Sequence, residues 1–158
     1  MKWKQYVWGM LRIGLGWIFL WAFVDKLLGL GFSTTAEKAW IAGVSPTSGF
    51  LLHATAGPFA SLYQNIAGNF VDWLFMMGLL LMGLSLLLGI GVRIASYAGA
   101  LLLFLMWAAV LPPAHNPVID EHIIYLLILL LLPEMKAGQY LGLGKWWQKK
   151  IGSHTWLE

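Results

Sequence analysis

Four ionisable side chains stand at the ends of long apolar runs in this sequence. Asp25 follows the first run, Asp72 precedes the second, and Asp120 and His122 begin the last. An ionisable residue at the edge of a membrane is a candidate for function, because burying it is expensive. Partial burial raises the pKa of a carboxyl toward that of imidazole, so such groups can exchange protons near neutral pH. We expect these four residues to be the catalytic groups.

A stripe of aromatic rings leads to the first of these acids. Trp17, Trp21 and Asp25 recur every four residues, which places them on one face of a helix. The stripe is suited to a quinone ring in an apolar slot with a proton-exchanging group at its mouth. We expect Trp17, Trp21 and Tyr125 to bind this cofactor. The alternative is that the tryptophans pack against helices or lipid while Asp25 pairs with Lys26.

Cationic side chains that could bind an anionic substrate are expected at the same membrane face as the four candidate catalytic groups. Lys26, His53 and His115 all lie in segments that we expect at that membrane face. The two histidines of residues 115–122, together with the nearby carboxylates, do not match the spacing of a strong metal-ligand motif. We therefore assign Lys26, His53 and His115 to anion binding and predict no metal site.

Four apolar runs must position these groups. Crossing about 30 Å of hydrocarbon takes about 20 helical residues, and we expect spans at residues 6–24, 74–92, 94–111 and 118–132. The last run is short for a crossing, so its helix either continues through Pro133 or draws its polar first turn below the membrane surface. Asn116 is expected to cap it, with Pro117 at the first helical position. Residues 1–158 thus form a single all-α membrane domain, a four-transmembrane-helix bundle.

The connection between the first two spans is too long and too apolar for a solvated loop. Residues 33–70 carry helix punctuation, namely a capping box at residues 34–37, a stop at Gly43, a proline start at residues 45–46 and a break at residues 57–58. We expect these short helices to lie over the outer end of the bundle as a lid on the extracytoplasmic side.

Basic residues are divided unequally between the two sides of such a bundle. The side of the termini carries Lys2, Lys4, Arg12, Arg93, Lys136, Lys145, Lys149 and Lys150, whereas the other carries Lys26 and Lys38. The positive-inside rule then predicts a multi-pass protein of the cell (plasma) membrane with both termini cytoplasmic. We expect Arg12 and Arg93 to be snorkelling anchors, and the Trp- and Lys-rich residues 142–150 to form an interfacial tail.

The composition excludes several classes of function. The 158 residues are 59% apolar and 11% charged, which indicates an integral membrane protein with the lipid bilayer as its partner. The chain has no cysteine, so thiolate and disulfide chemistry is excluded within it. A net charge of +3 without a basic stripe argues against nucleic acid, and we find no phosphate loop for a nucleotide.

Together these residues resemble the DoxX family, which includes the DoxD-type small subunit of archaeal thiosulfate:quinone oxidoreductase. The resemblance covers nearly the whole chain and rests on LRIG at 11–14, GWIFLW at 16–21, DKL at 25–27, SPT at 45–47, GFL at 49–51, GP at 57–58, DWLFM at 72–76, GIGVR at 89–93 and NP at 116–117 with Asp120, His122 and Tyr125. It implies a four-helix prokaryotic membrane protein tied to quinone-linked oxidation or to membrane redox complexes.

Three functions remain open from the sequence. The leading one is a membrane subunit of a quinone-linked oxidoreductase, possessing a quinone site between the helices and working with a redox partner subunit. The first alternative is a non-catalytic module that anchors or assembles such a partner. The second is a small carrier or channel built as a homo-oligomer.

Overall fold

The computed structural model describes residues 2–114 and 116–157, and every regular element within these ranges is helical. Its three longest helices are α1 (Lys2–Leu28), α4 (Asn69–Leu88) and α5 (Val92–Ala109). Each is long and apolar enough to cross a membrane, by length and composition. The predicted runs 6–24, 74–92 and 94–111 are therefore confirmed as helices, although α4 begins and ends a turn earlier than expected.

The fourth predicted run forms the shorter helix α6 (Glu121–Glu134). Its 14 residues reach about 21 Å at the standard rise, and the helix continues through Pro133. The expected start at Asn116 is wrong. Asp120 is the N-cap, because its carboxylate accepts two amides of the first turn and a charged acceptor binds amides more strongly than a neutral one. Asn116 instead accepts the amides of Val118 and Ile119 in the preceding turn.

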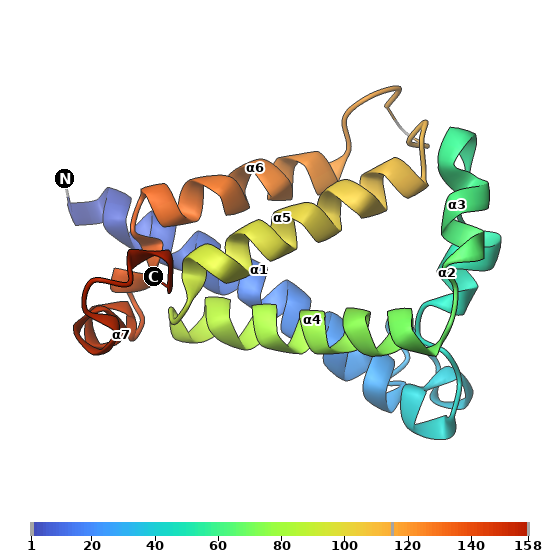
Figure 1. The fold of residues 1–158 in the computed structure, drawn as a ribbon, viewed down its shortest axis with the longest axis horizontal. Coiled ribbons are helices and arrows are strands. Elements are labelled where there is room, and N and C mark those ends of the chain that lie inside the picture. Colours follow the sequence, from blue (N-terminus) through green and yellow to red (C-terminus); the bar gives the residue numbers. More distant parts are fainter. Residues whose placement is uncertain (1, 115, 158) are drawn as a thin grey trace.

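The long helices form two pairs, α1 along α4 and α5 along α6 (Figure 1). Glycines allow α1 and α4 to touch, because a Cβ on Gly16 would lie 2.8 Å from the Leu87 nitrogen. A tight turn joins α4 to α5 through Gly89 and Gly91, whose φ angles of 75° and 63° favour glycine. The core between the pairs contains Leu15, Phe19, Met76, Leu79, Leu86, Leu103, Leu129 and Leu132.

Short helices lie across one end of these pairs (Figure 1). In chain order they are η1 (Ala36–Lys38), η2 (Trp40–Ala42), α2 (Ser48–His53), η3 (Gly57–Phe59) and α3 (Ala60–Asn65). The predicted stop at Gly43 is confirmed. Gly57 and Pro58 begin η3, although α2 already ends at His53. The predicted capping box is wrong, since Thr35 precedes η1 without a side-chain cap. The predicted start at residues 45–46 lies just before the observed one, because α2 begins at Ser48. The Ser45 hydroxyl accepts the Ser48 amide at 3.0 Å, as a capping residue does, and donates to Asp72.

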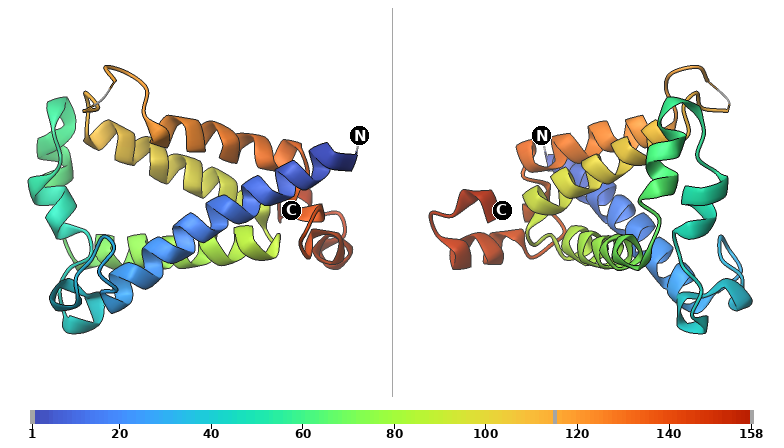
Figure 2. Two further views of the ribbon diagram at one scale, coloured as in Figure 1. Left: turned by 180° about the vertical axis from the view of Figure 1, so that it is seen from behind. Right: turned by 45° about the vertical axis from the view of Figure 1, so that its right-hand side comes forward.

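The opposite end of the bundle carries both ends of the chain together with η4 (Ala137–Gln139), α7 (Gly144–Ile151) and η5 (Thr155–Leu157) (Figures 1 and 2). Here Arg12 is 0% exposed, so its predicted role as a snorkelling anchor is wrong. Its guanidinium donates to the carbonyls of Leu86 and Leu87 at the end of α4 and to those of Ala137, Tyr140 and Leu141. Arg12 therefore joins α1, α4 and the C-terminal segment.

Candidate functional site

A hydrogen-bonded acid and imidazole begin α6. The Asp120 Oδ1 accepts the amides of His122 at 3.0 Å and Ile123 at 3.4 Å, and its Oδ2 lies 2.9 Å from the His122 Nδ1. Both side chains are largely covered, with exposed fractions of 21% for His122 and 13% for Asp120. The backbone bonds fix the carboxylate, and the carboxylate orients the ring. When Nδ1 carries a hydrogen and donates it to Asp120, Nε2 is the nitrogen left to exchange a proton.

An open apolar groove of about 310 Å³ runs between α1 and α6. Tyr125 and Ile128 form its α6 wall, and Tyr125 lies one helical turn after His122. The α1 wall consists of Val7, Met10, Leu11, Gly14, Leu15 and Ile18. A Cβ on Gly14 would meet nothing within 4 Å, so this glycine leaves space in the groove. Figure 2 shows α1 and α6 meeting at the end of the termini and diverging toward α2 and α3.

The two tryptophans expected to hold a quinone stack on each other outside this groove. Trp17 and Trp21 have ring centroids 5.5 Å apart, and Trp21 meets Phe32 edge-on at 5.1 Å. Neither tryptophan is among the groove-lining residues, and Trp17 is 54% exposed. Of the three predicted cofactor-binding side chains, only Tyr125 lines the groove.

Asp25 is buried at the end of α1 and holds the chain that follows. It accepts the amides of Phe32 at 3.2 Å and Ser33 at 2.9 Å and the Ser33 hydroxyl at 2.7 Å. The alternative pairing of Asp25 with Lys26 is not seen, since the one ion pair in the described part of the chain joins His122 and Asp120. The geometry therefore gives Asp25 a structural task, that of closing the turn after α1.

Asp72 holds a later part of the same connection to α4. Its carboxylate accepts the Ser45 hydroxyl at 2.8 Å and both the amide and the hydroxyl of Thr47. Tyr63 adds a third attachment, because its buried hydroxyl donates to the Leu105 carbonyl of α5 at 2.8 Å. Side chains thus tie the connection to α1, α4 and α5.

The predicted anion-binding residues are spread over this end of the molecule. Lys26 is partly buried in the last turn of α1, and His53 is exposed at the end of α2. His115 lies outside the described residues. No three acidic or histidine side chains gather as metal ligands within the parts of the chain that the structure describes. Asp120, His122 and Tyr125 are the predicted site residues that share one short stretch of one helix.

Comparison with known proteins gives no match. No family model, curated protein or solved structure matches this chain. The resemblance to the DoxX family stays a prediction from the sequence motifs, and the function has to be inferred from the geometry.

Two features of the site were not foreseen from the sequence. One is Gly14, which leaves an open space in the groove. The other is the face of α1 that lines the groove. Apolar residues cover every face of this helix, so the sequence does not indicate which one faces the groove. The described arrangement places an open apolar groove one helical turn from a hydrogen-bonded acid and imidazole.

Proposed function

We propose that the chain is a membrane subunit of a quinone-linked oxidoreductase and that it binds the quinone ring in the α1–α6 groove. The proposal rests on one observation, the apolar groove with Tyr125 on its wall and the Asp120–His122 pair one helical turn away. Ligand pockets of this type are mostly apolar with a few placed polar groups. The resemblance of the sequence motifs to those of the DoxX family suggests the same class of function.

The chemistry needs protons at the quinone and electrons from elsewhere. Reduction of a quinone to a quinol takes up two electrons and two protons. Tyr125 offers a hydroxyl to a quinone oxygen, and His122, oriented by Asp120, exchanges protons with the outside. This chain has no cysteine to carry sulfur, so the electrons would come from a redox partner subunit acting on a donor such as thiosulfate.

The proposal includes a placement in the membrane. We take α6 as a fourth crossing, with the bilayer thinned around its polar start. Residues 33–70 then form an extracytoplasmic lid. Both termini then lie on the cytoplasmic side with Lys145, Lys149 and Lys150 of α7. The shared position of the two chain ends (Figure 1) and the excess of basic residues there support this orientation.

The groove can be filled without disturbing the fold. Gly14→Leu places a side chain in open space, whereas Gly78→Leu is a matched control on α4, where a Cβ would meet only the Met82 methyl at 3.7 Å. Each protein is purified in mild detergent, and the extracted quinone is quantified per chain by mass spectrometry. We expect quinone in the wild type and in Gly78→Leu and its loss from Gly14→Leu.

A second readout separates binding from proton transfer. Titration with a short-chain quinone, followed by tryptophan quenching, should saturate for the wild type and for His122→Asn. Quinol formation, with electrons supplied by the native partner, should slow in His122→Asn alone. A wild type that holds no more quinone than its co-extracted lipid, with quenching unchanged by Gly14→Leu, would reject the proposal.

A non-catalytic assembly role is the second candidate, and the exposed aromatic stripe favours it. Trp17 is 54% and Phe32 75% exposed, and both contact Trp21. Such a surface suits a partner helix as well as lipid. If assembly is the function, Trp17→Ala and Phe32→Ala should release a co-purifying subunit while His122→Asn leaves the complex active.

A further inference from the structure

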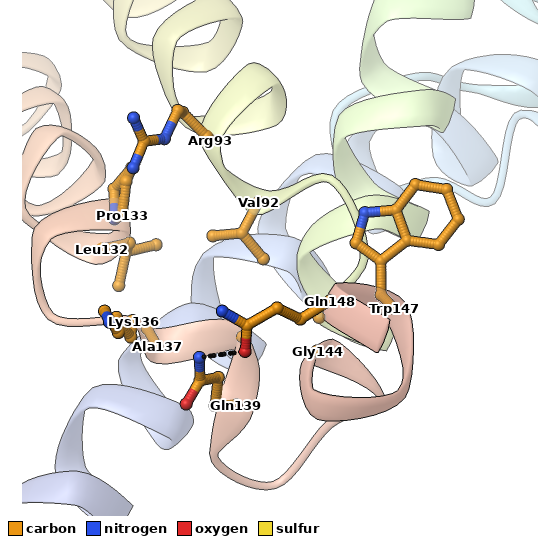
Figure 3. Close-up of a pocket in the computed structure, with 12 residues that line it drawn as sticks. Val92, Arg93, Leu132, Pro133, Lys136, Ala137, Gln139, Gly144, Trp147 and Gln148 are labelled. Carbon is orange, nitrogen blue, oxygen red and sulfur yellow. Dashed lines mark hydrogen bonds between the residues drawn. The ribbon is translucent and has the colours of Figure 1, made fainter. Parts of the chain in front are cut away.

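A second cavity lies at the end of the bundle that carries the termini. It is formed by the start of α5, the end of α6, η4 and α7, and has a volume of about 30 Å³. Leu132, Pro133, Val92 and Trp147 supply apolar walls, and Arg93 and Lys136 contribute the two cations (Figure 3). A space of this size holds about one water molecule or a single oxygen of a larger group. Any larger ligand must therefore sit at its mouth.

One donor of the Arg93 side chain is unsatisfied beside this cavity. Its Nε is buried and has no hydrogen-bond partner within the described residues. Glu134, the acid closest to the cavity in the sequence, is exposed and forms no ion pair with it. A buried donor without an acceptor is costly, and the planar guanidinium fork matches phosphate oxygens in particular. In Figure 3 the Arg93 side chain extends from α5 toward Pro133.

The surrounding elements add positive potential and membrane character. Arg93 stands in the first turn of α5, whose N-cap, Gly91, offers no side chain to the free amides of that turn. The other side of the cavity is α7, in which exposed Trp146 lies under Lys150 with 5.9 Å from the ammonium to the ring centroid. Exposed tryptophan beside lysine is typical of a segment at headgroup depth.

From these observations we propose that the Arg93–Lys136 cavity binds the phosphate of an anionic phospholipid. One phosphate oxygen enters the cavity and accepts from the Arg93 guanidinium, Lys136 supplies a second charge, and the rest of the lipid stays at the mouth. Basic pockets between helices at the cytoplasmic face are the usual sites for anionic headgroups. The site is independent of quinone binding, because it lies at the end of the bundle away from Asp120 and His122.

The test is lipid binding to the whole purified chain in detergent. Phosphatidylglycerol, phosphatidylcholine or inorganic phosphate is added at about 0.15 M salt, where exposed charges are screened, and adducts are counted by native mass spectrometry. Arg93→Gln should weaken phosphatidylglycerol binding by about tenfold, as expected for a lost hydrogen bond to a charged group. Lys136→Gln should also weaken phosphatidylglycerol binding, and it replaces Arg93→Gln as the test variant if that protein fails to fold.

Lys4→Gln is the matched control, because Lys4 is an exposed lysine on α1 that does not line the cavity. We expect it to bind like the wild type, and we expect phosphatidylcholine to bind weakly to all variants. Equal weakening by Arg93→Gln and Lys4→Gln would show diffuse attraction and overturn the proposal. Displacement of phosphatidylglycerol by inorganic phosphate alone would assign the site to free phosphate and would also overturn it.

Discussion

Replacing Arg12 with Met is the most demanding test of how the bundle is held together. The substitution keeps a long unbranched side chain but removes every donor from a guanidinium that is 0% exposed. Five backbone carbonyls lose this donor, two at the end of α4 and three in residues 137–141, although the Ala137 carbonyl keeps the Tyr140 amide. The last carbonyls of a helix have no amide donor within it, so those of Leu86 and Leu87 depend on Arg12. We expect the C-terminal segment to separate from α1 and α4.

The size of the effect follows from two opposing terms. Each hydrogen bond from a charged donor contributes about 1.5–3 kcal/mol, but the buried guanidinium also loses its hydration, at a cost of several kcal/mol. Leaving buried carbonyls without a donor costs about 1–3 kcal/mol each, so a net loss of a few kcal/mol is expected, which for a chain of this length lowers the melting temperature by about 10 °C. Arg12→Lys keeps the charge with fewer donors, so it should lie between the wild type and Arg12→Met.

Thermal unfolding followed by tryptophan fluorescence in detergent measures the first effect. Limited trypsin digestion measures the second, because α7 carries Lys145, Lys149 and Lys150 and should be cut sooner in Arg12→Met. Lys4→Met is the control, since it removes an exposed cation from the same helix. A melting temperature for Arg12→Met within about 2 °C of that control, with unchanged digestion, would refute the role of Arg12 in joining α1, α4 and the C-terminal segment.

Three further outcomes test other parts of the fold. Gly16→Ala should destabilise by about 2 kcal/mol because its Cβ would meet backbone at 2.8 Å, whereas Gly14→Ala, in open space, should stabilise by about 0.5–1 kcal/mol in the same thermal assay. Burial raises the pKa of the Tyr63 phenol above its ordinary 10.0, so its stabilising effect is complete below that pH and is lost as the pH rises through the folded pKa; Tyr63→Phe should flatten this alkaline loss in melting curves. Asp72→Asn should speed hydrogen exchange around Thr47 and leave exchange near Asp25 unchanged.

The long helices could be predicted from the sequence because hydropathy is a local property. Uncharged runs of about 20 residues have few alternatives to a helix once they are long enough to cross a membrane, and α1, α4 and α5 follow them. The start of α6 was misplaced because Asn116-Pro117 and Asp120 both satisfy local capping rules. The choice between them depends on which acceptor binds the amides more strongly, and Asp120 does.

The partners of the polar residues could not be predicted, because they are distant in the sequence. Arg12 bonds carbonyls 74 to 129 positions away, and Asp72 bonds groups 25 and 27 positions away. A lone arginine in an apolar run is indistinguishable from a snorkelling anchor until those contacts are known. The position of the groove could not be predicted for a related reason. Apolar residues cover all faces of α1, so the sequence does not indicate which face lies toward α6.

Two of the α1 residues that line the groove, Met10 and Ile18, are exposed on the side of the bundle. With α1 and α6 in a bilayer, a lipophilic ligand would enter by lateral diffusion within the hydrocarbon and would compete there with acyl chains. Its occupancy would then be governed by the mole fraction of ligand in the lipid, not by the concentration in the aqueous phase. Titrations in nanodiscs at different lipid-to-protein ratios should therefore superimpose only when plotted against that mole fraction.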